Sequence, residues 1–147
     1  MAKVSITGGR KAGKTTFLID SIVGHITDPE LKTDASLVVC APDKQMLKLI
    51  QDAVVAKLER RKVTFAHRSV SRKGSITVDN KTIKFLPTEY TLFIGISIDY
   101  LFLDNVEQMP VEFMSFIDMI MRPSVIVIQT YDDSIDVSKY QKNVEIE

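Results

Sequence analysis

ITGGRKAGKTTFLI, residues 6–19, joins a short apolar segment to a glycine-rich turn and then to a second apolar segment through Gly-Lys-Thr-Thr. The spacing Gly-x-x-x-x-Gly-Lys-Thr, from Gly8 to Thr15, is the pattern of a phosphate-binding loop, or P-loop. Residues 3–7 have the pattern of a strand and residues 14–26 that of a helix, which is the context that this loop requires. The stretch therefore predicts a strand–loop–helix unit that binds phosphate.

Each position of the loop has a chemical reason. Glycine lets the backbone curl so that N–H groups point at phosphate oxygens, and the positive end of the following helix faces the same anion. In this motif the Lys14 ammonium reaches the β- and γ-phosphates, and the Thr15 hydroxyl is a ligand of Mg²⁺. We expect these residues to bind the nucleotide: Gly8, Gly9, Arg10, Lys11, Ala12, Gly13, Lys14, Thr15 and Thr16.

A carboxylate that completes such a site is found in YLFLDNVE, residues 100–107, where four apolar residues end in Asp104. This is the pattern of a Walker B strand, and we expect Asp104 and Thr15 to hold the magnesium ion. The next residue, Asn105, is a poor base because its amide does not take up a proton. Glu107 follows three residues after Asp104, and a helical turn brings these positions to one side. We therefore expect Lys14, Asp104 and Glu107 to be the catalytic residues.

Apolar segments alternate with helical patterns along the rest of the chain. Strands are predicted at 37–41, 100–103 and 125–128, helices at 43–60 and 111–121, and a hairpin at 75–78 and 82–86. This order predicts one α/β domain over residues 1–147, a three-layer α/β/α fold with a mainly parallel sheet. The hairpin forms an insertion at about 63–86, and a polar tail covers about 132–147.

Composition narrows the classes of protein that remain. The chain has 147 residues, 45% of them hydrophobic, and a formal net charge of zero, so no overall field attracts nucleic acid or membrane. Its single cysteine, Cys40, excludes a disulfide framework and a four-cysteine zinc site within the chain. No apolar run approaches the length of a membrane span, so we expect no membrane partner and a cytoplasmic location.

A basic segment, residues 57–73, stands out against this neutral background. It contains seven lysines and arginines and one acidic residue, Glu59. Such a patch is typical of a surface that contacts nucleic acid, and we expect Arg68, Arg72 and Lys73 to bind DNA or RNA. The alternative is a solvated helix end, where Arg60 to Lys62 balance the negative end of a helix.

Taken in order, five segments resemble the RecA-like ATPase core of helicases and viral (phage) large-terminase motors. They are SITGGRKAGKTT (5–16), LVVCAPDKQMLKLIQDAV (37–54), GSITVDNKTIKF (74–85), IDYLFLDNVEQMP (98–110) and VIVIQTYDD (125–133). The resemblance implies that ATP and Mg²⁺ bind, that ATP is hydrolysed, and that the protein works with nucleic acid, in a host cytoplasm if it is viral. By position, Gln129 and Thr130 occupy the place of the sensor that reads the γ-phosphate.

The resemblance also has departures. The chain has one RecA-like lobe, which implies a homo-oligomer or a partner that supplies an arginine finger. These families place glutamate where this chain has Asn105.

Two alternatives remain open. The order of motifs is also similar to type II thymidine kinases, which are nucleoside kinases. The missing glutamate also favours a nucleotide-dependent switch with little turnover.

Overall fold

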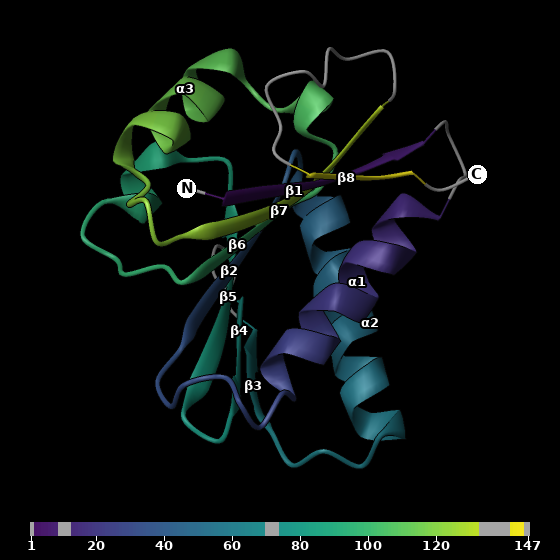
Figure 1. Ribbon diagram of the computed structural model, residues 1–147. Coiled ribbons are helices and arrows are strands. Elements are labelled where there is room, and N and C mark those ends of the chain that lie inside the picture. Colours follow the sequence, from purple (N-terminus) through teal and green to yellow (C-terminus); the bar gives the residue numbers. More distant parts are fainter. Residues whose placement is uncertain (1, 9–12, 70–73, 133–141, 146–147) are drawn as a thin grey trace.

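The central feature is an eight-stranded sheet with the strand order β3-β4-β5-β2-β6-β7-β1-β8 (Figure 1). This computed structural model describes residues 2–8, 13–69, 74–132 and 142–145. The strands are β1 (Ala2–Gly8), β2 (Ser36–Ala41), β3 (Ala66–Ser69), β4 (Gly74–Val78), β5 (Lys81–Pro87), β6 (Tyr100–Leu103), β7 (Ile126–Asp132) and β8 (Lys142–Glu145). The helices are α1 (Lys14–Ile26), α2 (Lys44–Arg60) and α3 (Val111–Ile120), with the short 3-10 helices η1 (Tyr90–Phe93) and η2 (Val106–Gln108).

The three predicted layers are confirmed. Helices α1 and α2 lie together on one face of the sheet, and α3 lies on the other (Figure 1). On the first face, Leu18, Ile22 and Val54 are fully buried, and on the second face Phe113 and Ile117 are almost so. Full burial of each such side chain contributes about 1.5–3 kcal/mol. The spacing that predicted the helices is therefore the spacing of the side chains that attach them to the sheet.

The predicted hairpin is confirmed as β4 and β5. Asp79 and Asn80 join the strands with φ of 49° and 72°, which Asp and Asn tolerate better than most residues. A third antiparallel strand, β3, extends the hairpin to the sheet edge and was not predicted, because AHRS carries a weak strand pattern. The region predicted as a polar tail, about 132–147, contains β8, which was not predicted and which pairs in parallel with β1. Pairing with an existing sheet edge supplies backbone hydrogen bonds, which do not depend on an apolar side-chain pattern.

The parallel strands bring the functional segments to one edge of the sheet. Strand β7 pairs with β1 on one side and with β6 on the other, and β6 pairs with β2, all in parallel. The carboxyl ends of all four strands therefore meet at the same edge. Because β7 lies between the other two, β1, which precedes the P-loop, is not a neighbour of β6, which precedes Asp104.

Helix α2 begins at this same edge. Asp43 is its N-cap, and the carboxylate accepts a hydrogen bond of 2.8 Å from the backbone N–H of Met46. An N-cap of this kind satisfies one of the free N–H groups at the start of a helix. Within the part of the chain that the structure describes, no helix is both long and apolar enough to cross a membrane.

Cys40 provides a probe of global opening. It is completely buried in β2, and burial raises the pKa of its thiol far above the usual range. The reactive thiolate is therefore both scarce and inaccessible in the folded protein. We expect a thiol reagent such as DTNB to modify the native protein orders of magnitude more slowly than the protein in denaturant. Equal rates under the two conditions would contradict the buried position.

Candidate phosphate and magnesium site

Helix α1 begins with a positively polarised end. Its N-cap is Gly13, with φ 82° and ψ 19°, a left-handed conformation that glycine adopts without strain. The first helical hydrogen bond runs from Phe17 N–H to the Gly13 carbonyl at 3.0 Å, so the preceding N–H groups have no acceptor within the helix. Gly13 has no side chain with which to cap this end, and the first turn carries no acidic residue. These properties suit an anion such as phosphate.

Lys14 lies over the end of β7. Its ammonium donates a hydrogen bond of 3.3 Å to the carbonyl of Tyr131. The strand next to β1 therefore holds the lysine at the carboxyl edge of the sheet, beside the start of α1. A positive charge at this place complements a phosphate chain bound at the helix end.

Asp104 and Thr15, 89 residues apart in sequence, meet at this edge. Asp104 follows β6 and is fully buried, and its N–H donates to the Cys40 carbonyl at 3.0 Å. The Thr15 hydroxyl lies 3.3 and 3.2 Å from the two carboxylate oxygens of Asp104. The structure therefore brings together the two residues predicted to bind the metal.

This donor set fits Mg²⁺. Hydroxyl and carboxylate oxygens are hard ligands, and Mg²⁺ commonly binds proteins through one or two of them while phosphates and water complete its shell. Among the described residues, no group of three or more His, Cys, Asp and Glu side chains is placed to hold a metal. Thr15 and Asp104 are thus the residues that would hold the ion together with a nucleotide.

The two predicted sensor residues point in opposite directions. Thr130 is buried and donates to Asp104 Oδ1 at 2.6 Å, on the side of the sheet where α1 lies. Gln129 is also buried, but successive residues of a strand face opposite sides of a sheet. Its amide nitrogen donates to Ser5 Oγ at 3.4 Å, and no described residue donates to its amide oxygen. Of the two predicted sensor residues, only Thr130 contacts the carboxylate of Asp104.

The electrostatics of Asp104 reflect its position. Burial raises the pKa of this carboxyl group above its usual value. Hydrogen bonds from Thr130 and Thr15 and the charge of Lys14 oppose that shift without cancelling it. A buried carboxylate of this kind gains stability when a cation is bound beside it.

The remaining predicted site residues are Glu107 and the other residues of the P-loop. Glu107 lies in η2 with an exposed side chain, so the predicted helical turn after Asp104 is a short 3-10 turn. Gly8 is the last residue of β1, one residue beyond the predicted end of that strand. Residues 9–12, which include Gly9, Arg10, Lys11 and Ala12, lie outside the described residues. Thr16 is exposed in the first turn of α1.

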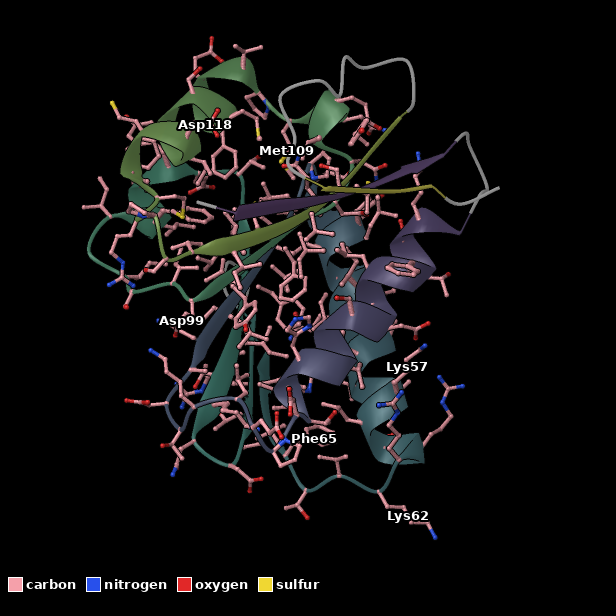
Figure 2. The ribbon with its side chains drawn as sticks, in the orientation of Figure 1. Lys57, Lys62, Phe65, Asp99, Met109 and Asp118 are labelled. Carbon is pink, nitrogen blue, oxygen red and sulfur yellow. The ribbon has the colours of Figure 1, made fainter. Side chains whose placement is uncertain are left out.

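The basic segment divides into separate parts. Lys57 forms an ion pair with Asp20 of α1. The C-terminal end of α2, which carries Lys57, and Lys62 in the turn after it lie away from Met109, which is near the carboxyl edge (Figure 2). Arg68 is exposed on the edge strand β3, while Arg72 and Lys73 lie outside the described residues. Of the three residues expected to bind nucleic acid, Arg68 is therefore the one that the structure describes.

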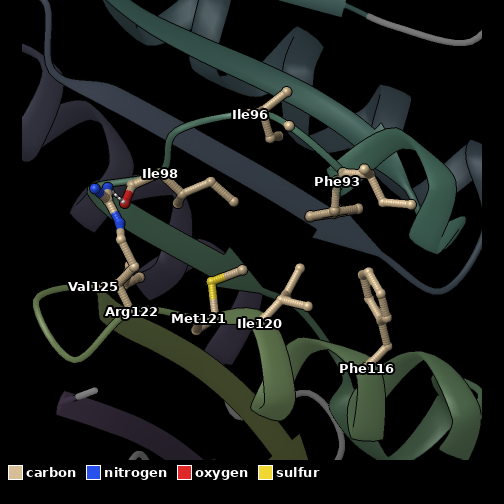
Figure 3. Close-up of a pocket in the computed structure, with 10 residues that line it drawn as sticks. Phe93, Ile96, Ile98, Phe116, Ile120, Met121, Arg122 and Val125 are labelled. Atoms are coloured by element: carbon tan, nitrogen blue, oxygen red, sulfur yellow. Dashed lines mark hydrogen bonds between the residues drawn. The ribbon is translucent and has the colours of Figure 1, made fainter.

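An apolar cavity of about 300 Å³ lies away from this site (Figure 3). Its lining comes from the segment after η1 and from the end of α3, including Ile96, Phe116 and Ile120. Arg122 closes one end and donates to Ser97 Oγ at 3.1 Å and to the Ile98 carbonyl at 3.3 Å. These residues precede β6 and β7, at the edge opposite to the phosphate site.

Sequence reasoning missed the structural contribution of Asn105. It has φ 53° and ψ 57°, and its side chain reaches both Asp104 and Met46 of α2. The available signal was an asparagine directly after a strand, since this residue type tolerates the left-handed region.

Comparisons with solved structures place this fold among phage large terminases. The large terminase of a thermophilic bacteriophage in complex with ADP superposes with a TM-score of 0.70 at 14% identity, over 98% of this chain and 40% of that one. The HK97 bacteriophage large terminase gives 0.71 at 17% identity, over 88% of this chain and 29% of that one. The large-terminase ATPase domain of a Thermus phage gives 0.60 at 15% identity, over 92% of this chain and 61% of that one.

The protein therefore has the α/β fold of a large-terminase ATPase domain, as the resemblance of its motifs predicted. The chain spans about 40% of the length of the first of these terminases. No protein-family model matches the sequence, and no curated protein matches it.

The raised pKa of Asp104 predicts that its ionised carboxylate destabilises the folded protein. The folded protein retains this proton to a higher pH than the unfolded chain, so Asp104 lowers the free energy of unfolding as pH rises above the ordinary Asp pKa of about 3.9. In EDTA without nucleotide, the Tm of Asp104→Asn relative to that of the wild type should therefore rise between pH 4 and pH 7, by about 2–4 °C for each kcal/mol lost by the wild type. The amide does not titrate, but it also places an N–H against one of the donors around Asp104, so the test is the change of this Tm difference with pH, which differential scanning calorimetry measures. Asp52→Asn, at an exposed carboxylate, is the control, and a Tm difference for Asp104→Asn that stays constant between pH 4 and pH 7 would contradict this account.

Proposed function

We propose that this chain is the Mg-ATP-binding lobe of a P-loop ATPase of the helicase and terminase type, and that it acts with nucleic acid. The observation that carries this proposal is the meeting of Thr15 and Asp104 at the start of α1, with the Lys14 ammonium at the same edge. ADP and ATP-gamma-S are the nucleotides named with the similar terminase structures, which supports adenine as the base.

The residues would divide the work as follows. The first N–H groups of α1 and the Lys14 ammonium bind the phosphate chain, and Thr15 and Asp104 hold the metal. Mg²⁺, when bound, neutralises charge on the β- and γ-phosphates. Thr130 lies within hydrogen-bond distance of Asp104 and so is placed to register a change at the metal site and pass it to β7.

Hydrolysis also requires a group that orients water, and we assign this role to Glu107. Asn105 occupies the place after the Walker B aspartate and cannot act as a base. Glu107 is an exposed carboxylate in the turn that follows, three residues beyond Asp104. An exposed side chain is free to turn toward a bound nucleotide, since catalytic contacts often tighten only in the complex.

These roles predict two distinct kinds of defect. Lys14→Ala and Asp104→Ala should weaken Mg-ATP binding itself, because they remove phosphate and metal contacts. Glu107→Gln should lower turnover by a factor on the order of 10² or more, the scale for loss of a general base, and leave nucleotide affinity nearly unchanged. Calorimetric Kd values and phosphate-release rates for each variant separate the two cases.

Glu112→Gln, at an exposed glutamate in the first turn of α3, is the matched control and should retain both properties. Wild-type turnover in Glu107→Gln would place the base elsewhere or on a partner. Phosphate release should rise when DNA is added. Formation of thymidine monophosphate from thymidine would instead support a nucleoside kinase. Tight binding without any product, even with DNA, would support a switch.

The nucleic-acid part of the proposal rests on the basic segment. Arg68 is exposed on an edge strand, and the end of α2 adds the exposed side chains of Arg60, Arg61 and Lys62. Arg68, Arg72 and Lys73 are the residues that we expect to contact phosphates. A contact of this type releases counterions, so its contribution depends on salt concentration.

The triple variant Arg68→Ala, Arg72→Ala and Lys73→Ala should flatten the salt dependence of DNA binding, because log Kd loses a slope of about 0.9 for each phosphate contact removed. ATP affinity should not change. Fluorescence anisotropy with labelled DNA at several salt concentrations measures the slope. A control triple at Lys32, Lys48 and Arg122 removes the same charge elsewhere, and equal slopes in the two triples would refute a localised DNA surface.

A further inference from the structure

Asn105 adopts a conformation that few residue types tolerate. It follows β6 directly and lies in the left-handed region, with φ 53° and ψ 57°. Glycine enters this region freely, and asparagine and aspartate enter it more readily than other residues. The conformation turns the chain sharply after Asp104 and directs both the backbone N–H and the side chain of Asn105 back toward the site.

From this position Asn105 contacts its neighbour Asp104 and two elements, β7 and α2. Its backbone N–H donates to Thr130 Oγ1 of β7 at 2.8 Å, and its side-chain nitrogen donates to Asp104 Oδ2 at 3.1 Å. The same nitrogen lies 3.9 Å from the sulfur of Met46 in the first turn of α2. Asn105 thus connects the end of β6 with its neighbouring strand and with the helix that follows β2.

The hydrogen bonds of Asn105 and Thr130 converge on the carboxylate of Asp104. Because the Thr130 hydroxyl accepts from the Asn105 N–H, its own proton is available to Asp104 Oδ1, at 2.6 Å. The other oxygen, Oδ2, receives the Asn105 amide, while the Thr15 hydroxyl lies near both oxygens. Thr130 and Asn105 therefore each hold one carboxylate oxygen of Asp104.

We propose that Asn105 is a positioning residue, which fixes the carboxylate of Asp104 toward Thr15 before nucleotide or metal arrives. This proposal deepens the assigned function and rests on it for its consequence in Mg-ATP binding. The amide meets this requirement and a carboxylate would not, because a carboxylate at position 105 has no N–H to donate and would add a second negative group beside Asp104. The residue that follows the metal-site aspartate thus orients that aspartate, and the water-orienting group lies elsewhere.

The test separates positioning from general stability. In Asn105→Gly the left-handed backbone and its N–H bond to Thr130 are retained, and only the side-chain amide is removed. Calorimetry gives the Kd of a non-hydrolysable ATP analogue in EDTA and in saturating Mg²⁺, and the ratio of the two is the gain from Mg²⁺. We expect this gain to fall about 10-fold or more, the usual loss when a group behind a metal ligand is removed. The Kd in EDTA should stay within about 2-fold, since no phosphate contact changes.

Asn80→Gly is the matched control. Asn80 is also left-handed, with φ 72°, but it lies exposed in the turn between β4 and β5. Its removal should leave the gain from Mg²⁺ unchanged. A gain in Asn105→Gly equal to that of the wild type overturns the proposal. So does a parallel loss of affinity with and without Mg²⁺ accompanied by a lower Tm, which is the result of a purely structural role.

A second measurement needs no nucleotide. In the free protein, NMR should show that the side-chain amide protons of Asn105 exchange with solvent at least 10-fold more slowly than those of Asn80, because only Asn105 donates to a buried carboxylate. Equal exchange rates would overturn the proposal even if ATP binding were found. Conversely, slow exchange in a protein that binds no nucleotide would uphold the Asn105 contact and refute the ATPase assignment.

Discussion

The buried carboxylate of Asp104 is the constraint on which the rest of the site depends. An ionisable group without water is costly unless donors surround it, and here the donors come from different parts of the chain. Thr15 belongs to α1, Thr130 to β7, and Asn105 to the turn after β6. The carboxylate is satisfied only when these elements stand in the observed order. The same arrangement leaves an acid, a hydroxyl and an ammonium at one edge of the sheet.

Strand β7 has a central position in this arrangement. It separates β1 from β6, and it supplies the Tyr131 carbonyl to Lys14 and the Thr130 hydroxyl to Asp104. Strand alternation then gives Gln129 a different environment, beside Ser5 on the opposite face. The candidate phosphate-binding residue Lys14 and the candidate metal-binding residue Asp104 are therefore both held by a strand that carries neither motif. The apolar cavity near Arg122 lies at the other edge, so it does not belong to the phosphate site.

The likeness to terminases is one of architecture at 14–17% identity. What the comparison shows to be shared is the α/β fold. Position 105 shows why such a likeness does not transfer chemistry residue by residue. An amide there is a donor to Asp104, whereas a glutamate at the same place would accept a proton. Under the proposed function, the side chain at this position therefore favours orienting Asp104 over activating water.

The sequence alone determined the parts whose signals are local. The P-loop spacing, the apolar runs that end in Asp104 or in Gln129 and Thr130, and the periodicity of α1 and α2 all depend on near neighbours, and each predicted its element. Only the tertiary structure decided what depends on distant pairing. It added β3 and β8, which are short strands stabilised by neighbours already in place. It distinguished Thr130 from Gln129 by the face of β7 that each occupies. It also supplied the contacts of Asn105, because the partners of that residue are defined by how β6, β7 and α2 converge in space.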